Sequence, residues 1–137
     1  MTQSWDERTP ANVAINNADA LQEIFNREDG KEWDYVFNCG GETRYSQGEE
    51  RYRTLNLALS VAVAKEAAKR KVKCFVEIST GSVYKPNSKP SAEDDKLKPW
   101  SQMATVKREA EEILSKIEGY VARAAPVRSS SPSPFAS

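Results

Sequence analysis

Two short apolar segments, separated by a long amphipathic stretch, constrain the fold of this chain most. Residues 33–39 are rich in aromatic and branched side chains and stop at a Gly-Gly pair, and residues 73–79 form a second such run that stops shortly before another glycine. Short runs of this composition favour buried strands. Between them, residues 55–70 carry apolar side chains in a broad stripe with helical spacing, which predicts a helix that packs on a sheet.

Two further helices and one further strand are expected. Residues 18–25 and 103–117 have apolar side chains three and four positions apart, and residues 120–122 begin a strand. Strands that alternate with helices predict an α/β fold with a mainly parallel sheet, in which the loops after the strands meet at one ligand-binding edge. Segments 38–41 and 79–82 therefore fall on that edge. The core positions predicted for the last helix are Ala110, Ile113, Leu114 and Ile117.

The composition excludes several classes of function. The chain has no histidine, which removes Ser-His-Asp and Cys-His catalysis and imidazole-based metal sites, so no metal is expected. Its 20 basic and 20 acidic residues cancel, which argues against nucleic-acid binding. No apolar run approaches the roughly 20 residues of a membrane span, and no secretory signal is recognisable. The two cysteines, Cys39 and Cys74, are expected to be buried and unpaired, as suits a cytoplasmic protein.

One ordered unit is predicted over residues 12–124. It would follow a flexible N-terminus, residues 1–11, and precede a disordered Ser/Pro-rich tail, residues 125–137. A weak strand candidate lies at residues 12–15, at the start of the ordered unit.

Five parts of the sequence form a pattern that is known from one protein family. They are Asp34-Tyr-Val-Phe-Asn-Cys-Gly-Gly41, Asn56, Phe75-Val-Glu-Ile-Ser-Thr-Gly-Ser-Val-Tyr84, Pro99 and Lys107-Arg-Glu-Ala-Glu111. With these stretches the chain resembles the NAD-dependent epimerase/dehydratase family, the extended short-chain dehydrogenases/reductases. This resemblance covers about residues 12–121 and implies a Rossmann-like three-layer fold, incomplete here, with NAD or NADP as cofactor. It also implies a substrate that carries a hydroxyl or carbonyl group, such as a nucleotide sugar.

The resemblance implies roles for five residues. Thr80 matches the hydroxyl residue that hydrogen-bonds the reacting oxygen of the substrate, and its alternative role is to cap the turn after the strand. Lys107 matches the lysine that binds the nicotinamide ribose and lowers the pKa of the catalytic Tyr. Taken alone, Lys107 is better explained as a solvated charge on a helix. Asn38, Gly40 and Gly41 match the segment that lines the cofactor, or they form an ordinary turn.

Two departures from the family predict impaired catalysis. Met103 stands four residues before Lys107, where the family has its catalytic Tyr, and a thioether cannot transfer a proton. Positioned acid–base catalysis contributes about 10²–10⁴-fold in rate. Tyr84 or Ser82 would have to take over this step, and no sequence pattern indicates that either does. The six glycines contain no G-x-G-x-x-G or G-x-x-G-x-x-G spacing, so the loop that binds a pyrophosphate is missing.

The missing first strands of the family would leave the strand at residues 33–39 with an open edge. A hydrophobic open edge favours pairing with another copy of the chain. Three interpretations therefore remain. The chain is an NAD(P)-dependent epimerase/dehydratase-like enzyme of impaired activity, a non-catalytic module that senses dinucleotide or binds protein, or an inactive truncated gene product.

Overall fold

The computed structural model describes residues 18–84, 95–117 and 122–125. The predicted N-terminus at 1–11, the candidate strand at 12–15 and all but the first residue of the Ser/Pro tail lie outside these ranges. In chain order the elements are α1 (Ala18–Phe25), β1 (Tyr35–Asn38), α2 (Glu49–Tyr52), η1 (Arg53–Ala58), α3 (Leu59–Lys69), β2 (Cys74–Ile78), η2 (Gly81–Val83), α4 (Gln102–Leu114) and β3 (Ala122–Ala125).

The three described strands form one parallel sheet in the order β1-β2-β3. β1 pairs with β2 from Tyr35 opposite Cys74 to Asn38 opposite Glu77. β3 lies on the other side of β2 in the same direction. Because parallel neighbours need a crossover, a helix connects each strand to the next. The predicted α/β fold with a mainly parallel sheet is therefore confirmed.

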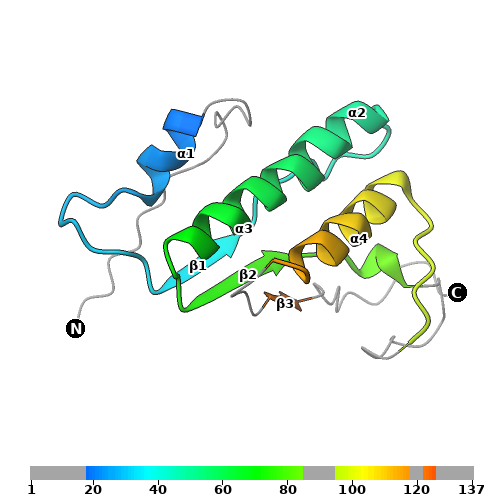
Figure 1. The fold of residues 1–137 in the computed structure, drawn as a ribbon. Coiled ribbons are helices and arrows are strands. Elements are labelled where there is room, and N and C mark those ends of the chain that lie inside the picture. The colour runs from blue at the N-terminus through cyan, green and yellow to red at the C-terminus, as the bar shows by residue number, and fades with distance from the viewer. Residues whose placement is uncertain (1–17, 85–94, 118–121, 126–137) are drawn as a thin grey trace, which may run out of the picture.

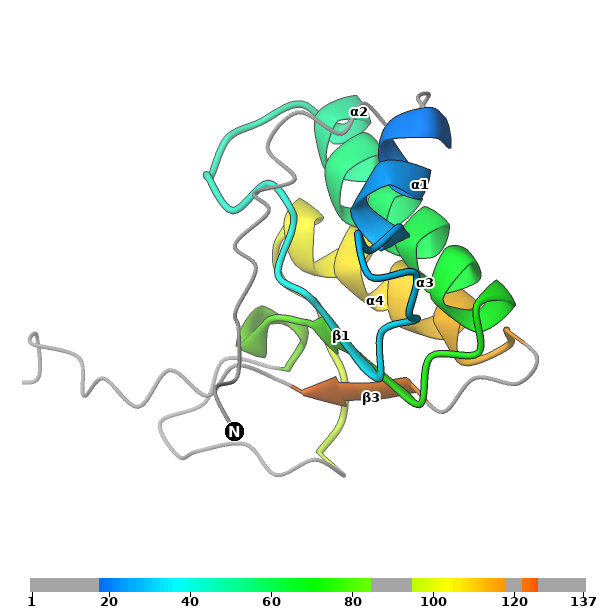
Figure 2. The ribbon, with the colours of Figure 1, turned by 90° about the vertical axis from the view of Figure 1, so that its left-hand side faces the viewer.

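The described helices cover one face of the sheet (Figures 1 and 2). Phe75 and Glu77 of β2 are buried on this face at 1% and 2% exposure. On the opposite face Tyr35 and Phe37 of β1 are 64% and 58% exposed. Two of the three predicted layers are thus described, and β1 lies at one edge of the described sheet.

One continuous helical stretch connects β1 to β2 and runs from Glu49 to Lys69 through α2, η1 and α3. The sequence predicted its start at Leu55. The helix begins earlier because Glu49 and Glu50 lie in its first turn, where negative charge is favourable. The sequence did not predict this start, because the first turn has no apolar periodicity. Its middle part, η1, is π-helical and buries Asn56 completely.

The core lies between this helix, α1, α4 and the sheet. Small side chains on α3 bring the helix close to the strands, and larger side chains from the other elements fill the remaining space. The predicted helix at 18–25 matches α1, and its Leu21 and Ile24 pack against this core. The buried members of the core are Phe25, Ala64, Ala67, Phe75 and Leu114.

α4 begins at a capping serine, since Ser101 Oγ accepts a hydrogen bond from the backbone N–H of Ala104 at 3.1 Å. Among its predicted core positions, Ala110 and Leu114 are buried and Ile117 packs against the core. The prediction for Ile113 is wrong, because that side chain is 36% exposed. The buried face of α4 passes through Lys107, and this rotates the core-facing side away from Ile113.

The prediction that both cysteines are buried is wrong. Cys39 is exposed because it lies beyond the end of β1, and Cys74 is half-buried on the uncovered face of the sheet. Both thiols are free. Within the described ranges no helix is long and apolar enough to cross a bilayer, and no three potential metal-ligating side chains gather there.

Candidate functional site

The carboxyl ends of β1 and β2 lie side by side, because the strands are parallel and Asn38 stands opposite Glu77. Residues 39–41 continue from β1 and residues 79–80 continue from β2. The two segments that the sequence predicted at one edge of the sheet are therefore at that edge. α4 runs across the same face and brings Lys107 to it.

Lys107 is buried at 8% exposure, so the alternative of a solvated helix charge is wrong. Its Nζ donates to Glu77 Oε1 at 3.1 Å and to the backbone oxygen of Ile78 at 2.8 Å. A Cβ added to Gly41 would lie 3.7 Å from Nζ, so the ammonium group stands between the two strand ends. An ammonium has three N–H donors. Within the described residues, two of them have acceptors, and the third is available to a ligand.

Asn38 is buried on the helix side of the sheet. Its Nδ2 donates to Glu77 Oε2 at 2.6 Å and to Ser60 Oγ at 3.2 Å, while its Oδ1 accepts from the backbone N–H of Gly40 at 3.2 Å. Asn38 therefore holds Glu77 and shapes the turn after β1. Its predicted contact with a cofactor stays a prediction.

Gly41 is in close contact with the helix that follows it. It has a φ of +154°, and an added Cβ would lie 2.6 Å from Asn56 Oδ1. The Asn56 amide holds the next residue, since Oδ1 accepts from Glu42 N at 2.6 Å and Nδ2 donates to Glu42 O at 3.1 Å. The space at Gly40 is also limited, because a Cβ there would be 3.1 Å from Asn38 Oδ1. Side chains at either glycine would move the loop away from the strand ends.

Thr80 caps η2, as its Oγ1 accepts from Ser82 N at 3.3 Å. The capping role considered from the sequence is therefore observed. Because the cap uses the oxygen as acceptor, the hydroxyl hydrogen stays free to donate, and no described residue accepts it. A hydrogen bond from Thr80 to a substrate oxygen stays a prediction. The neighbouring Ser79 is buried and bonds through its hydroxyl to the Glu111 carboxylate of α4.

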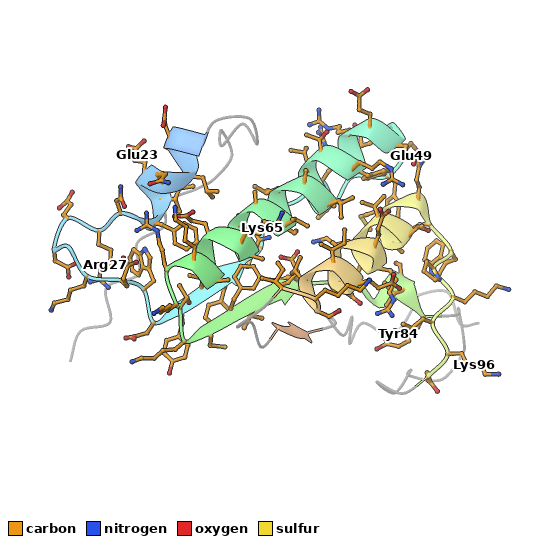
Figure 3. The ribbon with its side chains drawn as sticks, in the orientation of Figure 1. Glu23, Arg27, Glu49, Lys65, Tyr84 and Lys96 are labelled. Atoms are coloured by element: carbon orange, nitrogen blue, oxygen red, sulfur yellow. The ribbon has the colours of Figure 1, made fainter. Side chains whose placement is uncertain are left out.

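Met103 is half-buried in the first turn of α4, one turn before Lys107. Tyr84, a candidate substitute for the missing Tyr, lies at the same end of the molecule as the start of α2 (Figure 3). Its backbone forms a bridge with Leu97. In the described part of the chain, no hydrogen bond joins the Tyr84 hydroxyl to Thr80 or Lys107. Met103 carries no group that transfers a proton, and a substitute role for Tyr84 stays a prediction.

A charged cluster fixes the loop that follows Gly41. Glu42 is buried and accepts hydrogen bonds from the guanidinium of Arg44 at 2.7 Å and of Arg51 at 2.6 Å. The hydrogen bond from Arg44, followed by that from Arg51, holds the pKa of Glu42 well below its ordinary value. Tyr52 closes the loop, since its hydroxyl donates to Arg44 O at 2.7 Å and accepts from Gln47 N at 3.3 Å.

The sequence interpretation gave no role to Glu77 or Ser60, and it used Asn56 only as part of the family resemblance. Glu77 accepts hydrogen bonds from Asn38, Lys107 and, at 2.8 Å, Ser60. The strand pattern of the sequence could have indicated the role of Glu77. This residue occupies the same strand face as the core residue Phe75, and a charged residue at such a position must find partners inside the protein.

The model of the NAD dependent epimerase/dehydratase family matches residues 2–132 of the chain. The chain belongs to this family. The membership inferred from the strand ends and from the Ser-Thr-x-x-Val-Tyr stretch is therefore confirmed. No curated protein matches the chain.

Solved structures similar to the chain are members of the family that share its Rossmann-like fold. A dTDP-4-dehydrorhamnose reductase from Clostridium acetobutylicum has 26% identity and a TM-score of 0.60, over 77% of this chain and 38% of that one. The Bordetella bronchiseptica enzyme WbmG, in complex with NAD and UDP, has 21% identity and a TM-score of 0.66, over 80% and 34%. UDP-glucuronic acid 4-epimerase from Bacillus cereus, in complex with NAD, has 20% identity and a TM-score of 0.64, over 80% and 34%. The matched part is thus little more than a third of the length of each of these proteins.

Proposed function

We propose that the chain binds NAD or NADP at the carboxyl ends of β1 and β2 and has strongly impaired catalysis of its own. The observation that carries this proposal is the buried Lys107 ammonium, fixed between the strand ends with an acceptor for only two of its three N–H donors among the described residues. Beside it, the lack of a side chain at Gly41 lets the loop after β1 approach the Asn56 amide and the Lys107 ammonium closely. A ribose hydroxyl would accept the remaining N–H of Nζ.

The other residues of the edge suit a substrate with a polar oxygen. No residue in the described part of the chain accepts the Thr80 O–H while its oxygen caps η2, so it can orient a hydroxyl or carbonyl group. A bound nicotinamide would supply hydride transfer. We take a nucleotide sugar as the substrate class, since WbmG was solved with UDP and the Bacillus cereus enzyme acts on UDP-glucuronic acid.

Met103 favours a second candidate function, a module that senses dinucleotide without turnover. A thioether neither donates nor accepts a proton, so substrate and cofactor could bind here without efficient reaction. The absence of a G-x-G-x-x-G spacing in all 137 residues also predicts weaker binding of the pyrophosphate. These two features argue for binding over catalysis.

Isothermal titration calorimetry of the full chain with NAD⁺, NADH, NADP⁺ and NADPH tests the proposal. We expect one oxidised and reduced pair to bind, and Lys107→Met to weaken that binding by about tenfold or more, because it loses a hydrogen bond from a charged donor. Lys65→Met, which changes an exposed lysine of α3, is the matched control and should bind normally. Absence of heat with all four dinucleotides would contradict the proposal and support the inactive gene product.

Turnover separates the two candidate functions. We expect no conversion of UDP-glucuronic acid by the parent chain, measured by chromatography with the dinucleotide that binds. Met103→Tyr should produce measurable conversion in an impaired enzyme that lacks only its proton donor, whereas a module that only senses dinucleotide should stay without turnover. Conversion by the parent chain at the rate of a complete enzyme would exclude both impaired catalysis and the non-catalytic module.

A further inference from the structure

Glu77 is a carboxylate in the interior of a small α/β unit, at 2% exposure. Three elements donate to it. Asn38 comes from β1, Ser60 from α3 and Lys107 from α4. Burial of an ionised carboxylate is unfavourable unless it is paired and hydrogen-bonded, and these three donors satisfy it. Glu77 is thus the common partner of two residues that the family resemblance assigned to the site, Asn38 and Lys107.

We propose that Glu77 is a positioning residue that fixes the Lys107 ammonium at the dinucleotide-binding edge. The inference rests on the proposed function. Glu77 Oε1 and the Ile78 carbonyl hold two N–H donors of Nζ from the same strand, so the third donor stays beside Gly41. Without the carboxylate, the flexible four-carbon side chain of Lys107 would lose one of its two fixed contacts.

The pair is better explained by position than by stability. Replacing a buried ion pair with apolar side chains of similar volume is often neutral or stabilising, so such a pair is weak evidence for a stabilising role. Asn38 and Ser60 add hydrogen bonds that hold the Glu77 carboxylate itself in place. The arrangement therefore resembles the supporting contacts that orient a ligand-binding group.

The first test is a double-mutant cycle on dinucleotide affinity, with NAD⁺ or NADP⁺ as titrant. Glu77→Gln and Lys107→Met should each weaken binding by about tenfold, and the double variant should bind no worse than Lys107→Met alone. Glu66→Gln is the matched control, because Glu66 is also a buried carboxylate that pairs with a cation, Arg70, away from this edge. Its affinity should equal that of the parent. Parent-like affinity of Glu77→Gln, or additive losses in the double variant, would overturn the inference.

A second readout does not depend on dinucleotide binding. The rate at which Lys107 reacts with acetic anhydride, measured by mass spectrometry of its peptide, should rise at least about fivefold in Glu77→Gln, since a released amine reaches solvent. Lys107 in Glu66→Gln should stay as protected as in the parent, which would show that the loss of a buried carboxylate elsewhere in the fold does not release it. Equal protection in Glu77→Gln and the parent would overturn the inference.

The two readouts separate the two proposals. If the parent binds no dinucleotide, the proposed function fails, and the acylation rate still shows whether Glu77 holds Lys107. If circular dichroism shows that Glu77→Gln does not fold, Glu77→Asp replaces it in both tests. That variant keeps the charge and withdraws the carboxylate by one methylene, and the same losses and the same rise in reactivity are expected.

Discussion

Gly41 is the residue whose identity the fold restricts most at the candidate site. Its φ of +154° and the 2.6 Å gap between its virtual Cβ and Asn56 Oδ1 leave no room for a side chain. Gly41→Ala should lower the free energy of unfolding by about 2–4 kcal/mol, through backbone strain and displacement of the Asn56 amide. Urea unfolding followed by tryptophan fluorescence measures this.

Gly48 provides the matched control for that substitution. It has an ordinary φ of −65° and open space at its Cβ position. Gly48→Ala should therefore change the free energy of unfolding by less than about 1 kcal/mol, since the loss at a helix N-cap and the gain from a stiffer unfolded chain oppose each other. Equal effects of the two substitutions would show that Gly41 is not under steric constraint.

Glu42 makes the stability of the fold depend on acid pH. Its folded-state pKa lies below its ordinary value of 4.5, because of the hydrogen bonds from Arg44 and Arg51. The ionised form thus stabilises the fold fully above pH 4.5, and this stabilisation is lost as the pH falls further toward the folded-state pKa. Glu42→Gln should have a lower urea midpoint at pH 7 and a smaller change in midpoint between pH 5 and pH 3 than the parent. Glu50→Gln, at an exposed carboxylate of α2, should retain the pH dependence of the parent.

At this scale the sequence predicted which residues stand at the edge, and it could not predict where their side chains point. Lys107 was assigned to the site by the family resemblance, and its burial depends on a partner thirty positions away, Glu77. The hydrogen bonds of Asn38 to Glu77 and Ser60 could not be predicted either, because they require the three-dimensional packing of β1 against β2 and α3.

Among the elements, the start of α4 matters most for the site because it sets the position of Met103 and Lys107. Ser101 caps this helix through Ala104 N. Ser101→Ala should destabilise the fold by about 1 kcal/mol, since an early backbone N–H loses its acceptor. Thermal unfolding followed by circular dichroism measures this.

Ser115 lies at the other end of α4 and gives the control. Its hydroxyl donates to the carbonyl of Glu112 on the exposed side of the helix. Ser115→Ala should change the stability by less than about 0.5 kcal/mol, as expected for an exposed position. A larger loss for Ser115→Ala than for Ser101→Ala would contradict the capping role.

Elements with an apolar pattern were predictable, and elements organised by polar contacts were not. The strands at 35–38 and 74–78 follow directly from their branched and aromatic side chains. The start of the long helix at Glu49 and the π-helical turn around Asn56 do not, because a buried amide and an acidic first turn define them. The exposure of Ile113 was unpredictable for a similar reason, because a polar residue, Lys107, lies on the buried face of α4.

For the whole molecule, the position of β1 predicts self-association. β1 lies at one edge of the described sheet, and its Tyr35 and Phe37 side chains are large, apolar and more than half exposed. We propose that two copies of the chain pair through their β1 strands. Sedimentation velocity of the parent should show a mass that increases with concentration, and Phe37→Lys should shift the chain toward monomer.

Tyr45→Lys controls for the loss of an exposed aromatic side chain. Tyr45 is 67% exposed, in the loop between β1 and α2. Its replacement should leave the concentration dependence unchanged. A parent that is monomeric at every concentration, or a Phe37→Lys variant that associates like the parent, would contradict the proposed edge pairing.

The Glu77–Lys107 pair also limits how this chain can change over evolutionary time. Removing one partner of a buried ion pair costs about 3–5 kcal/mol, a large fraction of the stability of a small domain, whereas replacing both with apolar residues is often neutral. A single substitution at either position would therefore be selected against on folding grounds alone. We expect the two positions to covary among related sequences, so that a lineage that loses Lys107 also loses Glu77.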